Sequence, residues 1–283
     1  MTESSSAQKP TSQNPHTTQK HSTAQKQYLH LQKRQRFLIH FARIFLILAF
    51  LALWEFSAGT GLIDSFIFSS PSGIFSCFRN MVADKSIFGH IGATLYETAA
   101  SFGLVIVTSI LFAILFWLCP RISEILEPYL VILNSLPKSA LAPLLIVWLG
   151  ANQRTIIIAG MSVAIFGSIL SLYNTFIQMD PGKIKLIYTL HGTRRHVLTK
   201  VILPGSVPSI ISNMKINIGL CLVGVVIGEF LAARKGLGYL IIYSSQVFKM
   251  DWLLMSIVLL CIMAILLYAF VNLLEKGYQK GCR

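Results

Sequence analysis

Two ionisable side chains lie within or beside long apolar runs of this sequence, where a charge needs a specific partner. Lys138 interrupts one run directly after Pro137, and Glu229 follows another. A buried charge is costly unless it is paired or hydrogen-bonded, so each residue is a functional candidate. Lys138 would either attract an anionic solute or bond to backbone carbonyls that neighbouring prolines free. Glu229 would either form part of a gate or make an ion pair with Arg234 or Lys235.

Motifs for nucleophilic, metal or phosphate chemistry are otherwise missing from the sequence. No His-Glu-x-x-His run occurs, which excludes the common zinc protease motif, and the five cysteines lack metal-ligand spacing. No Gly-x-x-x-x-Gly-Lys-Ser/Thr loop occurs either, so this chain has no P-loop with which to hydrolyse ATP. We therefore expect no catalytic residue, no metal site and no cofactor.

The composition is typical of a membrane protein. Hydrophobic residues make up 54% of the 283 residues and charged residues only 12%, and the mean hydropathy is +0.66. Soluble domains carry about 25% charged residues. The net charge of +13 raises the question of a nucleic-acid surface, which the positions of the cations answer.

Six segments are long and apolar enough to cross a membrane. A spanning helix needs about 20 such residues, since each adds about 1.5 Å across a hydrocarbon core of about 30 Å. The sequence therefore predicts an all-α membrane protein with six transmembrane helices. Lys215 is expected to snorkel to the cytoplasmic surface or to hydrogen-bond between helices. The predicted spans are Phe37–Trp54, Thr98–Cys119, Ile125–Leu149, Thr155–Met179, Val207–Gly228 and Trp252–Leu274.

Lysine and arginine residues flank these spans unevenly. Most of the 24 lie in segments that are cytoplasmic if the N-terminus is inside. This distribution follows the positive-inside tendency and predicts both termini in the cytoplasm. It also explains the net charge without a nucleic-acid partner, because no nucleic-acid-binding motif occurs among these cations.

A membrane domain lies between two polar ends of the chain. Residues 1–36 are poor in apolar side chains at their start and predict a disordered, basic cytoplasmic tail. Residues 37–275 form the predicted transmembrane domain, and residues 276–283 a short cytoplasmic tail. Within this domain, the connection Glu229–Asp251 contains glycines that suit a tight turn, and it predicts a short additional helix.

The cytoplasmic segment between the fourth and fifth spans has the pattern of two short helices. Asp180 can cap a helix that begins at Pro181. A break follows at His191-Gly192, and Thr193 can cap a second helix that Pro204 would end. Two helices at such a bend form a compact projection that a soluble partner could grip.

This segment resembles the cytoplasmic "EAA" loop of type I ABC importer permeases, whose pattern is Glu-Ala-Ala, three residues, Gly, nine residues, then Ile-x-Leu-Pro. Further motifs, in order along the chain, are similar to the nitrate, sulfonate and taurine branch of that family. They are Pro71-Ser72, Glu127-Pro128, the run from Leu136 to Leu144, Trp148-Leu149-Gly150, Gly228-Glu229-Phe230 and Gly236-Leu237-Gly238-Tyr239-Leu240.

The predicted coupling loop, residues 180–204, also departs from the family pattern. Counted back from Leu203-Pro204, the glycine position falls on His191, and Gly192 comes one residue late. Lys185-Leu186-Ile187 occupy the Glu-Ala-Ala position, so the acidic residue is absent. The resemblance still implies a docking role, and a partner with altered charge would fit the changed side chains.

The resemblance implies a transmembrane permease subunit of an ATP-driven importer in a bacterial cytoplasmic membrane. The expected partners are ABC ATPase subunits, an extracytoplasmic solute-binding protein, a second permease copy forming a homodimer, and the lipid bilayer. Lys138 and Glu229 are the candidate residues of the translocation path. The implied solute is small and polar or anionic, like nitrate, sulfonates or taurine; a thiamine-precursor pyrimidine or a flavin is the alternative.

Two other classes of membrane protein remain open on the residues alone. An ion-coupled secondary transporter usually places several ionisable groups at the membrane midplane, whereas only Lys138 is a clear candidate here. An intramembrane hydrolase would need a histidine deep in a span, but His40 and His90 lie near the starts of apolar segments.

Overall fold

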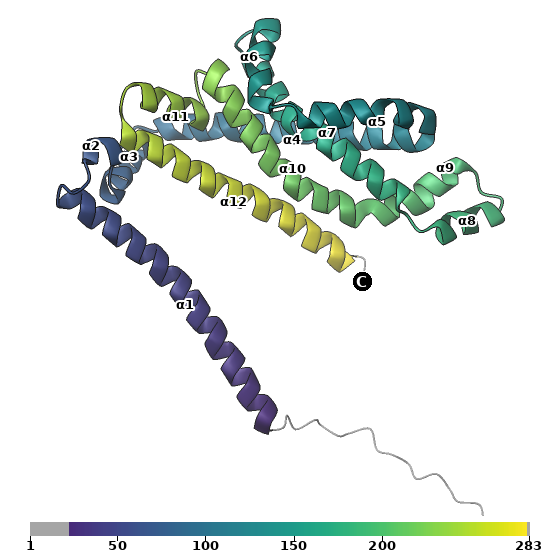
Figure 1. Cartoon of the computed structure of the whole chain (residues 1–283), viewed down its shortest axis with the longest axis horizontal. Helices are drawn as coiled ribbons and strands as arrows, with labels where there is room; N and C mark the ends of the chain where they lie inside the picture. Colours follow the sequence, from purple (N-terminus) through teal and green to yellow (C-terminus); the bar gives the residue numbers. More distant parts are fainter. Residues whose placement is uncertain (1–22, 282–283) are drawn as a thin grey trace, which may run out of the picture. The chain divides into compact units, whose positions relative to one another are not determined.

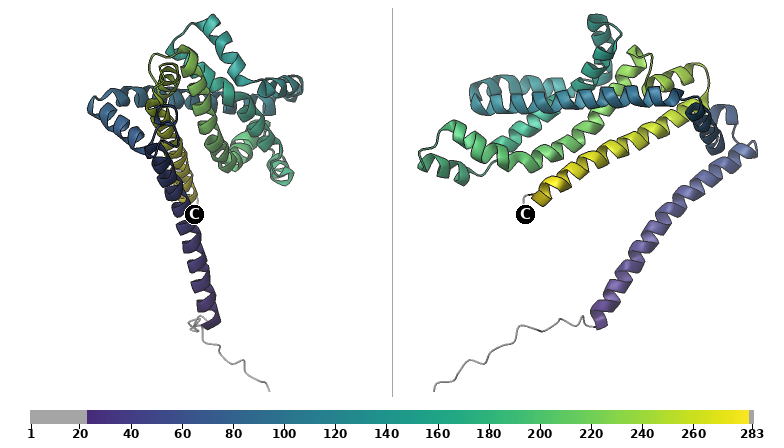
Figure 2. Two further views of the ribbon diagram at one scale, coloured as in Figure 1. Left: turned by 60° about the vertical axis from the view of Figure 1, so that its left-hand side comes forward. Right: turned by 180° about the vertical axis from the view of Figure 1, so that it is seen from behind.

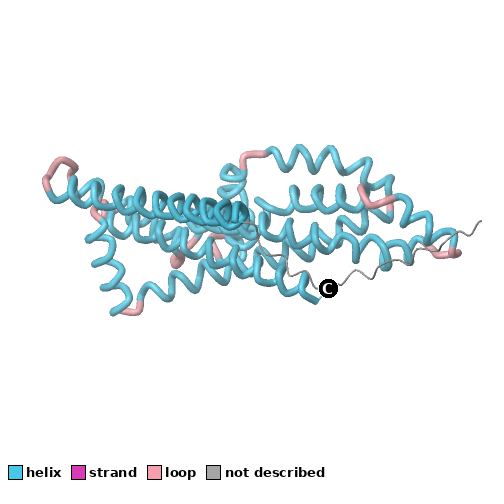
Figure 3. Tube along the Cα trace, turned by 90° about the horizontal axis from the view of Figure 1, so that it is seen from below, coloured by secondary structure: helices cyan, strands magenta, loops and turns pink. Residues whose placement is uncertain are grey.

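The computed structural model describes residues 23–281, and all regular structure in that range is helical. The chain divides into two compact units, Met1–Phe56 and Ser57–Arg283. Short loops join consecutive helices, as Figure 3 shows in pink.

The first unit is dominated by one long helix, α1 (Thr23–Gly59), drawn in purple and blue in Figure 1. Its part from Phe41 to Gly59 is apolar enough to span a membrane. The helix begins within the predicted tail, so residues 23–36 are helical and not disordered, because their Gln, Lys, Leu and Arg residues favour helix. Residues 1–22 of that tail lie outside the described residues.

Three long helices form the centre of the second unit: α4 (Ser86–Leu118), α7 (Gln153–Ile177) and α10 (Leu203–Ala232). α7 packs along both α4 and α10, and the two further views in Figure 2 show the same bundle. Gly160 on α7 faces Gly224 on α10, where a Cβ atom on Gly224 would lie 2.9 Å from the Cα of Gly160. Small residues thus let the two backbones approach closely, as in other membrane helix pairs.

A second layer packs on one end of this bundle. It contains α2 (Ser65–Phe68), α3 (Pro71–Ala83), α11 (Leu237–Gln246) and α12 (Met250–Gly281). Met255, Leu237 and Cys77 share its buried apolar core. Burial raises the pKa of the Cys77 thiol, so this cysteine packs as a small apolar residue. The short helix predicted within Glu229–Asp251 is therefore confirmed as α11.

Within the described residues, five helices are long and apolar enough to span a membrane, and a bent pair brings the number to six. The pair is α5 (Pro120–Ser135) and α6 (Lys138–Leu149), which meet at 99°. The predicted all-α architecture is thus confirmed. The predicted span Ile125–Leu149 is this bent pair, because Pro137 has no N–H to continue the helix and holds the residue before it extended.

Candidate functional site

The predicted coupling loop begins with a short capped helix, α8 (Pro181–Thr189). The Asp180 carboxylate accepts a hydrogen bond of 2.8 Å from the Gly182 backbone N–H, which satisfies one free donor of the first turn. Pro181 takes the first helical position, where its missing N–H costs nothing. The cap and helix follow the sequence prediction.

The break after α8 has the hydrogen-bond pattern of a helix end with one left-handed residue. The Gly192 N–H donates to the Ile187 carbonyl at 2.8 Å, and the His191 N–H donates to the Tyr188 carbonyl at 3.0 Å. His191 has φ +59°, the conformation that glycine usually supplies at this place. His191, which occupies the position of the family's glycine, therefore has the left-handed backbone conformation that glycine usually supplies.

Gly192 is also constrained, although for a different reason. A Cβ atom there would overlap the Ile187 side chain and lie 2.8 Å from the Ile187 carbonyl oxygen. Any larger residue must therefore push the two halves of the bend apart. The bend therefore constrains both residues, His191 by its backbone conformation and Gly192 by the space around it.

The second half of the loop is continuous with the following span. Thr193 caps α9 (Arg194–Val197) through a mutual contact with His196. A π-helical turn, Leu198–Ile202, then leads directly into α10. The predicted end at Pro204 was wrong, because the π-helical turn directly before Pro204 carries the helix past the N–H that proline lacks.

One side of the coupling loop is buried against the bundle. Val197 and Ile202 are fully buried in the core that contains Phe116 and Phe176. The Arg194 guanidinium donates to the Trp117 carbonyl at 2.8 Å and lies over the Trp117 ring. These contacts fix the loop to the ends of α4 and α7.

The other side of the loop is exposed. Lys185, Leu186, His191 and Pro204 are exposed, whereas Ile187, Gly192 and Leu203 are half-buried. Leu186 is 59% exposed and Leu190 70% exposed. The loop thus offers an apolar surface bordered by cations, and no acidic residue follows Asp180 within it.

Lys138 lies at the bend between α5 and α6. Its ammonium donates to the Leu133 carbonyl at 2.6 Å and lies 5.1 Å from the centre of the Phe166 ring. In a continuous helix that carbonyl would accept the N–H of residue 137, which a proline lacks. Of the two alternatives for Lys138, the structure therefore shows the bond to a freed carbonyl.

Glu229 is fully buried at the opposite end of α10 from the coupling loop. Its two oxygens accept hydrogen bonds of 2.6 Å from the Thr94 hydroxyl and from the Gly238 N–H. The expected ion pair with Arg234 or Lys235 is not formed, since both of those side chains are exposed. The carboxylate instead lies at the N-terminus of α11, where free N–H groups and the helix dipole favour a negative charge.

Further contacts extend this arrangement into a polar group that we call the carboxyl cluster: the half-buried His90 and the buried Thr94, Glu97 and Glu229. The Thr94 hydroxyl also accepts from the Leu237 N–H at 2.8 Å, and His90 Nδ1 accepts from the Gly236 N–H at 3.1 Å. The cluster thus joins α4 to the turn between α10 and α11.

Glu97 is the member of the cluster that the sequence prediction missed. It is only 3% exposed and lies close to the Glu229 carboxyl. The second span was predicted to start at Thr98, which placed Glu97 outside it. The signal was the spacing of His90, Thr94 and Glu97, which puts all three on one face of a helix.

Lys215 forms an ion pair with Glu275 on α12. Of its two expected roles, the structure shows the bond between helices. Within the described residues, no group of three or more His, Cys, Asp and Glu side chains has the arrangement of a metal site.

Residues 105–281 match the family model described as "Binding-protein-dependent transport system inner membrane component". The chain belongs to this family. The match runs from the middle of α4 through the coupling loop to the end of α12 and covers more than half of the chain. It decides against the secondary transporter and the intramembrane hydrolase.

Curated relatives support the predicted branch. The chain is 25% identical to the putative aliphatic sulfonates transport permease protein SsuC of Bacillus subtilis, over 81% of this chain and 83% of that protein. It is 26% identical to the taurine transport system permease protein TauC of Escherichia coli, over 68% and 70%. It is also 27% identical to the formylaminopyrimidine transport permease protein ThiX of Halalkalibacterium halodurans, over 81% and 91%.

A solved structure supports the fold. The chain resembles the inward-facing MetNI methionine ABC transporter with a TM-score of 0.60 and 15% identity, over 68% of this chain and 95% of that chain. The predicted architecture of an ABC importer permease, and the membrane-spanning character of this chain, are thereby confirmed.

Proposed function

We propose that this chain is the permease subunit of an ATP-driven importer and that the coupling loop is the handle for its ATPase subunits. The observation that carries the proposal is the two-sided structure of residues 180–204. One side is locked to α4 and α7 by buried residues and Arg194, and the other is exposed and apolar. A rigid element that differs in position between two states is what such coupling requires.

The remaining partners follow from the family description. An extracytoplasmic binding protein would deliver the solute, and a second copy of this chain would complete the path as a homodimer. In this arrangement the coupling loop and both termini face the cytoplasm of a bacterial cell. The basic character of the loop supports that orientation.

The proposed solute is small and polar or anionic, of the sulfonate or taurine kind. The named relatives include sulfonate and taurine permeases. A formylaminopyrimidine permease is also among them, so a pyrimidine is the alternative solute. Ligand binding to the partner binding protein, scanned by thermal shift over these solutes, tests the choice directly.

The coupling role of residues 180–204 is tested with Gly192→Val in the reconstituted complex of permease and ATPase subunits. The valine side chain would meet the Ile187 carbonyl and open the bend. We expect assembly with the ATPase to persist and ATP hydrolysis to continue, while solute uptake falls at least about tenfold, the effect of about 1.4 kcal/mol. Gly219→Val is the matched control, since a Cβ at Gly219 meets no atom within 4 Å. Unchanged uptake in Gly192→Val would reject the coupling role.

Lys138 and Glu229 enter this proposal as residues that position the path. Lys138 holds the bend between α5 and α6, and Glu229 holds α11. Uptake by Lys138→Ala and Lys138→Met distinguishes attraction of an anion from support of the bend. If both variants lose uptake but keep the same affinity for the solute, Lys138 supports the bend.

A further inference from the structure

The first helix of the coupling loop, α8, turns one face away from the bundle. Ile184 and Ile187 pack against the buried core that contains Phe116. Lys185 and Leu186 lie on the opposite face of this helix, and both are exposed. Figure 1 shows α8 and α9 projecting beyond the ends of α7 and α10. The side chain at position 185 therefore meets whatever lies outside the bundle.

Cations without an acidic partner surround this face. The loop contains five of them, whereas its one acidic residue, Asp180, serves as a helix cap. In the described part of the chain the ion pair that forms is Lys215–Glu275, so the loop cations are unpaired there. Arg194 bonds to the Trp117 carbonyl instead. The other four cations of the loop are exposed: Lys183, Lys185, Arg195 and Lys200.

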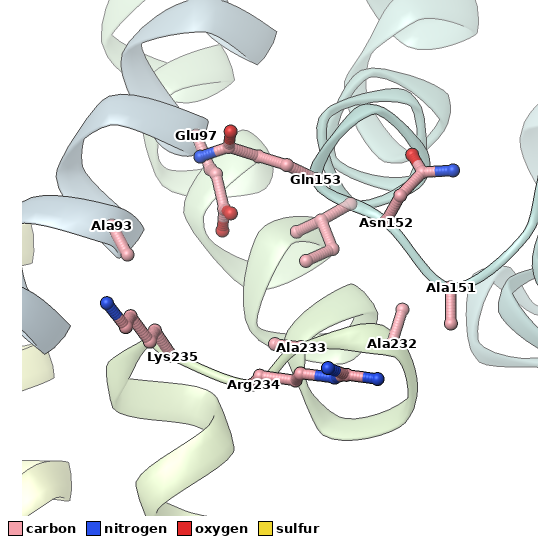
Figure 4. A pocket seen from close by; sticks show the side chains of 10 residues that line it. Ala93, Glu97, Ala151, Asn152, Gln153, Ala232, Ala233, Arg234 and Lys235 are labelled. Carbon is pink, nitrogen blue, oxygen red and sulfur yellow. The ribbon is translucent and has the colours of Figure 1, made fainter.

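The cations at the other end of α10 differ in this respect. Arg234 and Lys235 line a pocket whose wall also contains Glu97, and Figure 4 shows the three side chains around it. Those cations share their surroundings with a carboxyl group of the same chain, whereas the exposed cations of the loop do not. A carboxylate that faces the loop must therefore come from another molecule.

Apolar side chains between the cations indicate that this molecule is a protein. Leu186, Tyr188 and Leu190 are all exposed on α8 and at its end. An exposed apolar patch with a polar rim is typical of a protein interface. Because the loop projects beyond the ends of the spans, a soluble subunit can reach it. The complementary surface has an apolar floor for the leucines and carboxylates around that floor.

We propose that the coupling loop docks in an acidic groove of its ATPase subunit, where Lys185 pairs with a carboxylate, and that this charge selects the ATPase. The proposal rests on the proposed function and adds the charge of the partner. The family pattern has glutamate at the position of Lys185, which suits a groove of the opposite charge. An ATPase built for glutamate would place a cation beside Lys185, and like charges across an interface oppose binding.

The test reverses the charge at position 185 and measures assembly of the full-length chain with its ATPase subunit by calorimetry in detergent. Lys185→Glu should weaken assembly at least about tenfold, because it places like charges together. Lys185→Met, which keeps the apolar stem and loses only the charge, should weaken it less. Equal affinity of Lys185→Glu and the wild type would overturn the proposal. Tighter assembly of Lys185→Glu would show that the groove is basic and would overturn it as well.

Arg79→Glu is the matched control for net charge. Arg79 is exposed on α3, which packs against the start of α4, whereas the coupling loop contacts Trp117 at the end of α4. This variant should assemble like the wild type. A loss as large as that of Lys185→Glu would assign the effect to net charge and overturn the role of position 185.

Anionic lipid is the competing partner for these cations, and vesicles distinguish it. The loss of assembly in Lys185→Glu should be the same in vesicles of phosphatidylcholine and in vesicles that also contain phosphatidylglycerol. A loss that occurs only with phosphatidylglycerol would assign the cations to the membrane surface and overturn the proposal.

Selection is tested with a second ATPase, whose own permease has glutamate at the position of Lys185. It should bind Lys185→Glu more tightly than the wild type, because the reversed charge suits its groove. Equal binding of the two would overturn the selective role of Lys185.

These results are independent of the coupling test with Gly192→Val. If Gly192→Val loses uptake while Lys185→Glu assembles normally, the coupling role is supported and the acidic groove is rejected. If Lys185→Glu loses assembly while Gly192→Val imports normally, the acidic groove is supported and the coupling role is rejected.

Discussion

The coupling loop and the carboxyl cluster lie at opposite ends of α10 and are built in opposite ways. The loop takes its shape from neighbours in sequence: Asp180 caps its own helix, and the bend closes between Ile187 and Gly192. The cluster joins residues more than a hundred positions apart, such as Thr94 and Glu229. The comparison suggests that damage to the loop affects coupling, whereas damage to the cluster affects the whole fold.

Glu229→Ala should have the largest effect on stability. The change leaves the Thr94 hydroxyl and the Gly238 N–H without their acceptor in a buried place. We expect a loss of about 2–6 kcal/mol, since each of the two unpaired buried groups costs about 1–3 kcal/mol. Denaturant unfolding of the purified chain in detergent measures it, with the exposed Glu124→Ala as control. A loss no larger than that of the control would show that the cluster does not hold the fold.

Gly236→Ala should follow with a loss of about 2 kcal/mol or more. Gly236 has φ +133°, and a Cβ atom there would overlap the Glu229 carboxyl. Backbone strain of this kind costs about 1–3 kcal/mol before the overlap is counted. Gly219→Ala is the matched control, because its Cβ would meet nothing and alanine favours helix. If both variants unfold at the same denaturant concentration, the backbone of Gly236 and its contact with Glu229 do not stabilise the fold.

Arg194→Ala should cost about 1 kcal/mol. It removes the bond to the Trp117 carbonyl and the contact with the Trp117 ring, both at the edge of the loop. Hydrogen exchange of the loop amides should therefore rise in residues 181–200 and stay unchanged in α11. Exchange that rises equally in both regions would show that the two ends are not independent.

His191→Gly should have the smallest effect and the opposite sign. The left-handed conformation of His191 costs a residue other than glycine about 1–2 kcal/mol. Glycine avoids this cost but loses more conformational entropy on folding, which offsets part of the gain. We expect the loop to gain about 0.5 kcal/mol, seen as slower exchange of the Gly192 amide, with uptake unchanged. Faster exchange would mean that the His191 side chain itself stabilises the bend.

The coupling loop could be predicted closely from the sequence because its determinants are local. Asp180, Pro181 and Thr193 mark helix starts by residue type alone, and His191-Gly192 marked the break. The continuation of the helix through Pro204 into α10 was missed, since the residue type of a proline does not show whether the preceding turn can do without its N–H. The bend between α5 and α6 was missed because apolar composition indicates that a segment lies in the membrane but does not fix the angle between its two helices.

The carboxyl cluster could be predicted only in part. Glu229 was identified as a residue that needs a partner, but its partners come from α4 and α11, far away in sequence. Glu97 was placed outside the span because hydropathy records average polarity and not the environment of one side chain. The family motif at Gly236-Leu237-Gly238 was seen, and the structure gives its reason: room beside the carboxyl and a free N–H for it.

The sequence by itself determined that this chain spans a membrane, which family it belongs to and where its coupling loop begins, because apolar length, charge placement and capping residues act over short distances. Only the tertiary structure decided that Glu97 faces a pocket and that Glu229 bonds to the start of α11. It also decided that the Lys138 ammonium bonds to the Leu133 carbonyl at the bend between α5 and α6. Those outcomes depend on which helices pack together, and close packing is a property of the whole bundle.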